Sequence, residues 1–194
     1  MSGVPTLGHL GALMAMVLPG MESAGLWQVR SCRDAAACAM ADRHYSRRRS
    51  SIGSGKLGGP NRRLVLVAQD ERAVWVTTWP EFQQDGMDSW RCSVFRNEGS
   101  ALSSALILEA MDLTCRLWTD RPRHGWSTYV DTAKVRSANP GYCFKRAGWV
   151  LDRTYRPDRR RRSLIRLTCT MLDVCRTDVA LCRDAPVCRG SLPG

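Results

Sequence analysis

The amino-acid sequence predicts an α/β domain with a mixed central sheet of about six to seven strands flanked by helices. Apolar or alternating runs of strand length recur along the chain, and one long segment has the apolar period of an amphipathic helix. Strands that cluster before this helix imply an antiparallel half, whereas strand, helix and strand across residues 90–131 imply a parallel crossover. A sheet whose strands separate at such a crossover offers a cleft at the strand ends.

The first half of the chain predicts three strands and one short helix. Alternating apolar and polar residues predict the first strand, and an alanine-rich segment with Ser31 or Asp34 as its cap predicts the helix. A segment rich in Ser, Gly and Pro predicts a loop, and two apolar runs after it predict an antiparallel hairpin. The predicted elements are a strand at 26–32, a helix at 35–40, a loop at 50–61, and strands at 64–68 and 73–79.

The second half contains the strongest helix of the chain. Leu102, Leu106, Leu113 and Leu117 fall on one face of a helix predicted over 101–118. A short helix is expected between Pro140 and the glycine at position 148. The elements predicted around these two helices are strands at 90–96, 126–131, 149–155 and 163–168, with a further short helix at 171–182.

This pattern divides the chain into an extension at 1–25, a domain at 26–170 and a tail at 171–194. The first basic residue is Arg30, and the apolar run at 10–18 is too short to cross a bilayer. Nine cysteines are present, without a CxxC pair. We therefore expect a cytoplasmic protein with reduced thiols and no membrane partner.

The charge of the chain is strongly basic, at +11, and it is unevenly placed. Seven basic residues and no acid lie between positions 43 and 63, and a second run follows near the C-terminal end. A solvated loop explains either run alone, whereas two runs in one domain favour a surface that binds phosphates, with double-stranded DNA as the partner. The candidate DNA-binding residues are Arg43, Arg47, Arg48, Arg49, Arg62, Arg63, Arg159, Arg160, Arg161 and Arg162.

The order of elements across residues 26–168 resembles the GNAT superfamily of N-acyltransferases. That resemblance implies an acyl donor; the sequence does not identify it, and an acyl-coenzyme A is one candidate. The glycine loop with which the superfamily holds coenzyme A is absent. At the equivalent place a strand leads into the N-terminus of the long helix, where free N–H groups can bind a phosphate or carboxylate. The candidate donor-binding residues there are Asn97, Glu98, Gly99, Ser100, Ser103 and Ser104.

Four local segments sharpen the resemblance: Ala41–Arg47, Phe95–Gly99, Tyr129–Asp131 and Asn139–Trp149. Together they look like the Mom family of phage DNA-modification proteins. The resemblance implies a GNAT-like fold and modification of the N6 amine of adenine in DNA, which protects the DNA from restriction. It also implies functional roles for His44, Tyr45 and Asp131, and an iron requirement has been proposed for the family.

Each candidate catalytic residue has a structural alternative. His44 can serve as a base or a metal ligand, or can be a loop histidine within the basic surface. Tyr45 can stack on a flipped base or donate a proton, or can lie at the edge of the core. Asp131 can join His44 on a metal ion, or can cap the turn after its strand.

Tyr142 is the fourth candidate, because GNAT proteins often use a tyrosine in the corresponding helix to protonate a leaving thiolate. Its alternative is packing of the helix against the sheet. Three functions therefore follow from the sequence: a Mom-like DNA modifier, an N-acetyltransferase that uses acetyl-coenzyme A, and a basic DNA-binding module without catalysis.

Overall fold

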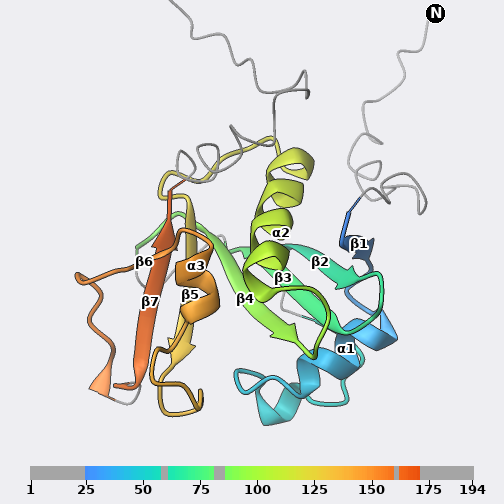
Figure 1. Ribbon diagram of the computed structural model, residues 1–194, viewed down its shortest axis with the longest axis horizontal. Helices are drawn as coiled ribbons and strands as arrows, with labels where there is room; N and C mark the ends of the chain where they lie inside the picture. Colours follow the sequence, from blue (N-terminus) through green and yellow to red (C-terminus); the bar gives the residue numbers. More distant parts are fainter. Residues whose placement is uncertain (1–24, 58–60, 81–85, 160–161, 171–194) are drawn as a thin grey trace, which may run out of the picture.

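The computed structural model describes residues 25–57, 61–80, 86–159 and 162–170. These residues form one mixed sheet of seven strands with three α-helices and a short 3-10 helix (Figure 1). The predicted extension, apart from Gly25, and the predicted tail and its helix at 171–182 lie outside the described residues. None of the described helices has the length and apolar character needed to cross a membrane.

The strands follow the spatial order β1-β2-β3-β4-β5-β7-β6. Every neighbouring pair is antiparallel except β4 and β5, which run parallel and are connected along the chain through the crossover helix α2 (Ser103–Leu117). The predicted mixed sheet is therefore confirmed, including its antiparallel half and the parallel pair at the crossover. The strands are β1 (Trp27–Arg30), β2 (Arg62–Ala68), β3 (Ala73–Trp79), β4 (Trp90–Asn97), β5 (Trp126–Asp131), β6 (Val150–Leu151) and β7 (Leu164–Cys169).

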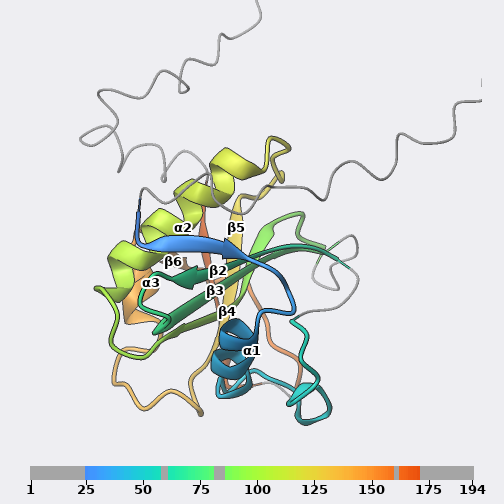
Figure 2. The same cartoon turned by 90° about the vertical axis from the view of Figure 1, so that its right-hand side faces the viewer.

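Helices cover the sheet on both faces. The helices α2 (Ser103–Leu117) and α3 (Tyr142–Arg146) pack on one face, and α1 (Ala35–Asp42) packs on the other, against β2, β3 and β4 (Figure 2). The side of α2 contains the larger core, in which Trp126 contacts both Trp75 and Trp90 edge to face. The 3-10 helix η2 spans Arg49–Ser51 in the loop after α1.

Two strands are shorter than their sequence patterns predict. The segment 149–155 keeps only the two residues of β6, because the Asp152 carboxylate accepts from the Thr154 N–H at 2.8 Å and turns the chain. The same carboxylate binds the buried guanidinium of Arg166 at 2.7 Å. The segment 26–32 ends as a strand at Arg30, because the Asp34 N–H donates to the Ser31 carbonyl. Asp34 caps α1 as predicted, accepting from the Ala37 N–H at 2.9 Å.

Candidate functional site

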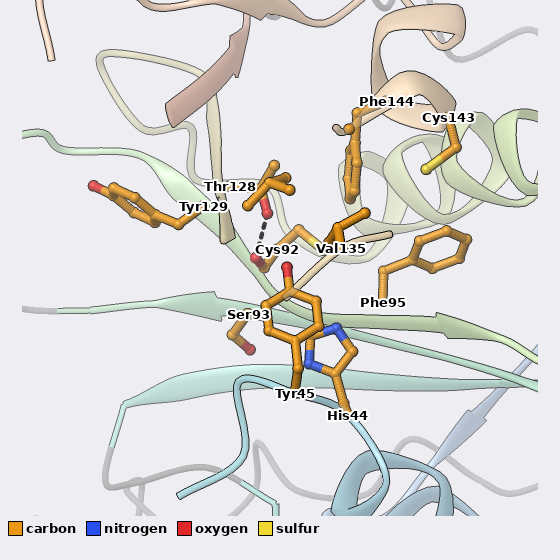
Figure 3. A pocket seen from close by; sticks show the side chains of 12 residues that line it. His44, Tyr45, Cys92, Ser93, Phe95, Thr128, Tyr129, Val135, Cys143 and Phe144 are labelled. Carbon is orange, nitrogen blue, oxygen red and sulfur yellow. Dashed lines mark hydrogen bonds between the residues drawn. The ribbon is translucent and has the colours of Figure 1, made fainter. Parts of the chain in front are cut away.

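A cavity opens where the parallel strands β4 and β5 separate. Their pairing runs only from Trp90 with Trp126 to Cys92 with Thr128, and both strands continue beyond it. The cavity has a volume of about 150 Å³ and lies in this gap (Figure 3). A cleft is expected at this place, because the strands separate at the crossover. Its lining residues are His44, Tyr45, Cys92, Ser93, Phe95, Thr128, Tyr129, Val130, Val135, Gly141, Cys143 and Phe144.

Four segments that are far apart in the sequence supply this lining. They are the residues after α1, strand β4, the end of β5 with the loop after it, and the start of α3. Gly141 lets α3 approach closely, since its φ is +73° and a Cβ there would lie 2.6 Å from Cδ1 of Leu167. Each of the four local motifs quoted from the sequence contributes at least one lining residue.

His44 and Tyr45 enter the cavity from the end of α1. The His44 N–H donates to the Ala41 carbonyl at 2.9 Å, so the pair directly continues the last helical turn. The two rings contact each other with centroids 4.3 Å apart. Burial lowers the pKa of the His44 imidazole to about 4, and the nearby Arg96 guanidinium acts in the same direction. The imidazole is therefore neutral at neutral pH.

Tyr45 connects the cavity to the end of β5. Burial raises the pKa of its phenol, while a hydrogen bond with the Asp131 backbone acts in the opposite direction. The phenol is consequently protonated near neutrality and can donate a hydrogen bond or a proton. In Figure 3 its hydroxyl points toward the labelled residues of β4 and β5.

The Asp131 carboxylate serves the turn after β5. Its Oδ1 accepts from the Ala133 N–H at 3.1 Å, and its backbone carbonyl accepts from Lys134 and Val135. Asp131 is not among the cavity-lining residues, although its charge contributes to the raised pKa of the Tyr45 phenol. Asp131 therefore caps the turn after its strand, which was the structural alternative to a catalytic role for this residue.

Two thiols line the cavity that sequence reasoning did not select, Cys92 and Cys143. Burial raises the pKa of both thiols, that of Cys92 by the larger amount. Both are therefore neutral and poorly nucleophilic at neutral pH. Cys143 occupies the position next to Tyr142, whose side chain is 56% exposed and does not line the cavity.

A cluster of three charged side chains, Arg43, Arg96 and Glu98, holds the region beside His44 in place. Glu98 accepts from Arg43 at 2.7 and 2.8 Å and from Arg96 at 2.5 Å. Arg96 also donates to the Arg43 carbonyl at 2.9 Å. These hydrogen bonds lower the pKa of the Glu98 carboxyl to about 2. The cluster joins the end of α1 to the end of β4, and it keeps the Arg96 charge close to the imidazole.

The backbone N–H groups of the predicted donor-binding segment are partly used by a side chain of the same segment. Asn97 accepts from the N–H groups of Gly99 and Ser100 at 3.1 and 2.9 Å, and donates to Ser103 Oγ at 2.9 Å. The Asn97 side chain thus takes backbone donors that a phosphate would use. The last two residues of the segment, Ser103 and Ser104, lie in the first turn of α2.

The predicted DNA-binding arginines have different environments. Arg47 is nearly buried: it binds Asp42 at 2.8 Å and donates to the carbonyl oxygens of Ser51 and Lys56. Arg63 donates to the Leu57 carbonyl at 2.8 Å, and Arg62 pairs with Asp120 at 3.1 Å. The exposed members are Arg43, Arg48, Arg49, Arg62, Arg159 and Arg162, whereas Arg160 and Arg161 lie outside the described residues.

The donors near the cavity do not fit an iron site. Across 25–57, 61–80, 86–159 and 162–170, the His, Cys, Asp and Glu side chains form no group of three that could hold a metal ion. The proposed pair of His44 and Asp131 is not completed by a third ligand within these ranges, and the Asp131 carboxylate is engaged by its own turn.

Comparisons with known proteins give no relative for this site, because no family model, curated protein or solved structure matches the chain.

Proposed function

We propose that the protein has a GNAT-like fold and modifies DNA in the manner of the Mom family, by transferring an acyl-type group to the N6 amine of adenine. One observation carries this proposal: the four segments that resemble the family meet around a single cavity. The proposal therefore rests on the combination of local sequence and position.

The chemistry of the cavity suits a flat, uncharged ring. The aromatic rings of Tyr45, Phe95 and Phe144 line it, and a flipped base can stack on such rings. Because the cavity contains a neutral imidazole and a neutral phenol, it provides hydrogen-bonding groups without a fixed charge. A nucleobase is a better occupant than a phosphate or a carboxylate.

Exposed cations that follow the cavity-lining pair in the sequence suit a polyanion outside the cavity. Arg48 and Arg49 are exposed in the loop that directly follows His44 and Tyr45. Phosphates held there would place a neighbouring nucleotide near the cavity, and contacts of this type carry no sequence information. Positioning is the main requirement of the reaction, because the lone pair of the adenine amine is delocalised into its ring.

The transfer itself forms a bond from N6 to the carbonyl carbon of the donor, breaks the bond from that carbon to the leaving group, and releases one proton from N6. Tyr45 is the cavity residue best suited to protonate a leaving group, since its phenol retains its proton at neutral pH. Ser103 and Ser104, at the start of α2, are the remaining candidates for contact with the donor.

Mass spectrometry of nucleosides from a host that expresses the protein tests this function. We expect a modified deoxyadenosine with the wild-type chain and its loss in the Tyr45→Ala variant. His124→Ala is a matched control, because His124 lies in the loop before β5 and does not line the cavity. If soluble wild-type protein leaves the host with only its ordinary and methylated bases, the proposed function is wrong.

A further inference from the structure

The His44 imidazole has one of its two ring nitrogens fully engaged by Ser46. The Ser46 backbone N–H donates to Nδ1 of His44 at 3.2 Å, and the Ser46 hydroxyl oxygen lies 2.7 Å from the same nitrogen. A backbone amide can only donate, so Nδ1 must carry the lone pair. In the neutral ring the proton therefore resides on Nε2, and the Ser46 hydroxyl is a second donor to Nδ1.

The ring is held in the neutral state by its surroundings. Burial and the charge of Arg96 disfavour the imidazolium, and Arg96 is itself fixed by Glu98 and the Arg43 carbonyl. Contact with the Tyr45 ring restricts rotation of the imidazole. One tautomer and one orientation are thus selected before any ligand binds.

The Nε2 edge of the ring lies on the cavity side. Figure 3 shows the His44 imidazole entering from the α1 side, with one nitrogen directed toward the labelled residues of β4 and β5. The other nitrogen is the one engaged by Ser46. The atom that His44 offers to a ligand is consequently an N–H donor, not a lone pair.

We propose that His44 binds a lone-pair acceptor of the substrate through Nε2–H, and that Ser46 is the positioning residue that fixes this tautomer. This inference rests on the proposed function, which supplies two acceptors of the same chemistry: a ring nitrogen of the flipped adenine and the carbonyl oxygen of the transferred group. It also implies that His44 is not the base that removes the N6 proton, since its lone pair is occupied by Ser46.

Nitrogen-15 NMR of the histidine side chains tests the tautomer independently of activity. The chain has only three histidines, so spectra of His44→Gln and His124→Ala variants suffice to assign the His44 signals. At pH 7 we expect the correlation pattern of an imidazole protonated only at Nε2. The Ser46→Ala and Ser46→Thr variants keep the backbone N–H and should retain the wild-type pattern, whereas Ser46→Pro, which lacks this N–H, should show a mixture of tautomers. A proton on Nδ1 in the wild-type ring would overturn the assignment.

Substitutions of His44 test the donor role in the expressing host. Glutamine keeps an N–H donor near the position of Nε2 but has no imidazole lone pair, whereas ionised glutamate offers only acceptors. We expect His44→Ala and His44→Glu to lower adenine modification by about 100-fold or more, as the loss of one oriented donor typically does. His44→Gln should retain at least about tenfold more modification than His44→Ala.

The outcomes separate this inference from the proposed function. Equal loss of modification in folded His44→Gln and His44→Ala proteins would overturn the donor role while leaving the DNA-modifying function intact. Activity that follows the His44 tautomer, with Ser46→Ala active and Ser46→Pro impaired, supports the donor role. Absence of modification with the wild-type chain refutes the proposed function, and the NMR measurement then decides the Ser46 assignment by itself.

Discussion

The hydroxyl of Thr128 donates to the carbonyl oxygen of Cys92 at 3.0 Å, at the last paired residues of β4 and β5. Both residues are buried, and both line the cavity. The side chain of one strand thus gives the other strand a hydrogen-bond partner at the point where their ladder ends. The gap that forms the cavity begins at a satisfied polar contact, because an unpaired buried carbonyl would be costly.

Replacing Thr128 by valine should destabilise the protein, since valine has the same shape but leaves the Cys92 carbonyl without this donor. We expect the free energy of unfolding to fall by about 1–2 kcal/mol. Urea denaturation measures the change. Thr78→Val is the matched control, because the Thr78 hydroxyl makes only a long bond of 3.4 Å to the Arg91 carbonyl and its loss should cost less. Equal losses of unfolding free energy in the two variants would show that the Thr128 hydrogen bond contributes no more to stability than the longer Thr78 bond.

Arg47→Ala should unfold the loop after α1, because it leaves Asp42 without its cation and removes the donors to the Ser51 and Lys56 carbonyls. The expected loss in the free energy of unfolding is about 3 kcal/mol, the usual consequence of breaking a nearly buried ion pair from one side. The control is the double variant Arg48→Ala and Arg49→Ala, which changes exposed residues and should alter stability by less than about 1 kcal/mol.

That double variant should instead weaken DNA binding. If both guanidinium groups contact phosphates, the slope of log K against log salt on duplex DNA should decrease by up to about 1.8, since each contact contributes about 0.9. The loss should be similar for all sequences. Filter binding or fluorescence anisotropy over a salt series measures the slope. An unchanged slope would mean that the loop faces away from the nucleic acid.

The stability of the protein should depend on the protonation of His44. The native pKa of about 4 lies below the unfolded value of 6.5, so the unfolded chain binds the proton more readily. The contribution of the neutral ring is fully present above pH 6.5 and is lost as the pH falls toward 4. In urea denaturation, the wild-type chain should therefore lose more stability than His44→Gln across this window. Parallel curves for the two proteins would contradict the depressed pKa.

Asp131→Asn should preserve both the fold and the adenine modification, because an asparagine oxygen can accept from the Ala133 N–H as the carboxylate does. Asp131→Ala removes that acceptor and should lower the free energy of unfolding by about 1 kcal/mol. Nucleoside mass spectrometry combined with thermal denaturation tests both variants. Loss of modification in a stable Asp131→Asn protein would show that the negative charge is needed.

Periodicity predicted the sheet well, because most strands are covered on at least one face by helices. The β-branched runs at 64–68 and 73–79 pair as β2 and β3, and the leucine pattern over 101–118 forms α2. The prediction was wrong at 149–155, where a carboxylate turn at Asp152 stops an otherwise suitable strand. Such turns depend on a side-chain contact with Arg166, a residue 14 positions away, which periodicity does not contain.

The site was only partly accessible to sequence reasoning. His44 and Tyr45 were selected from local motifs, and both line the cavity. Cys92 and Cys143 were missed, because the sequence around a cysteine in an apolar strand or helix looks the same whether its side chain lines a cavity or packs in the core. The different environments of Arg47 and Arg48 were equally hidden, since adjacent arginines in a basic run look alike until the loop folds around Asp42.

The aromatic core has an optical consequence. Six of the seven tryptophans are buried, and several lie within about 6 Å of one another at steep angles, whereas the cavity is lined by tyrosine and phenylalanine. Emission from the buried indoles should be blue-shifted and depolarised by energy transfer among them, with strong near-ultraviolet dichroism. Phe95 and Phe144 line the cavity and pack against Trp75 and Trp149, so a ligand that enters the cavity lies one ring away from these indoles. Intrinsic fluorescence therefore reports the packing of the α2 face, and that packing borders the cavity.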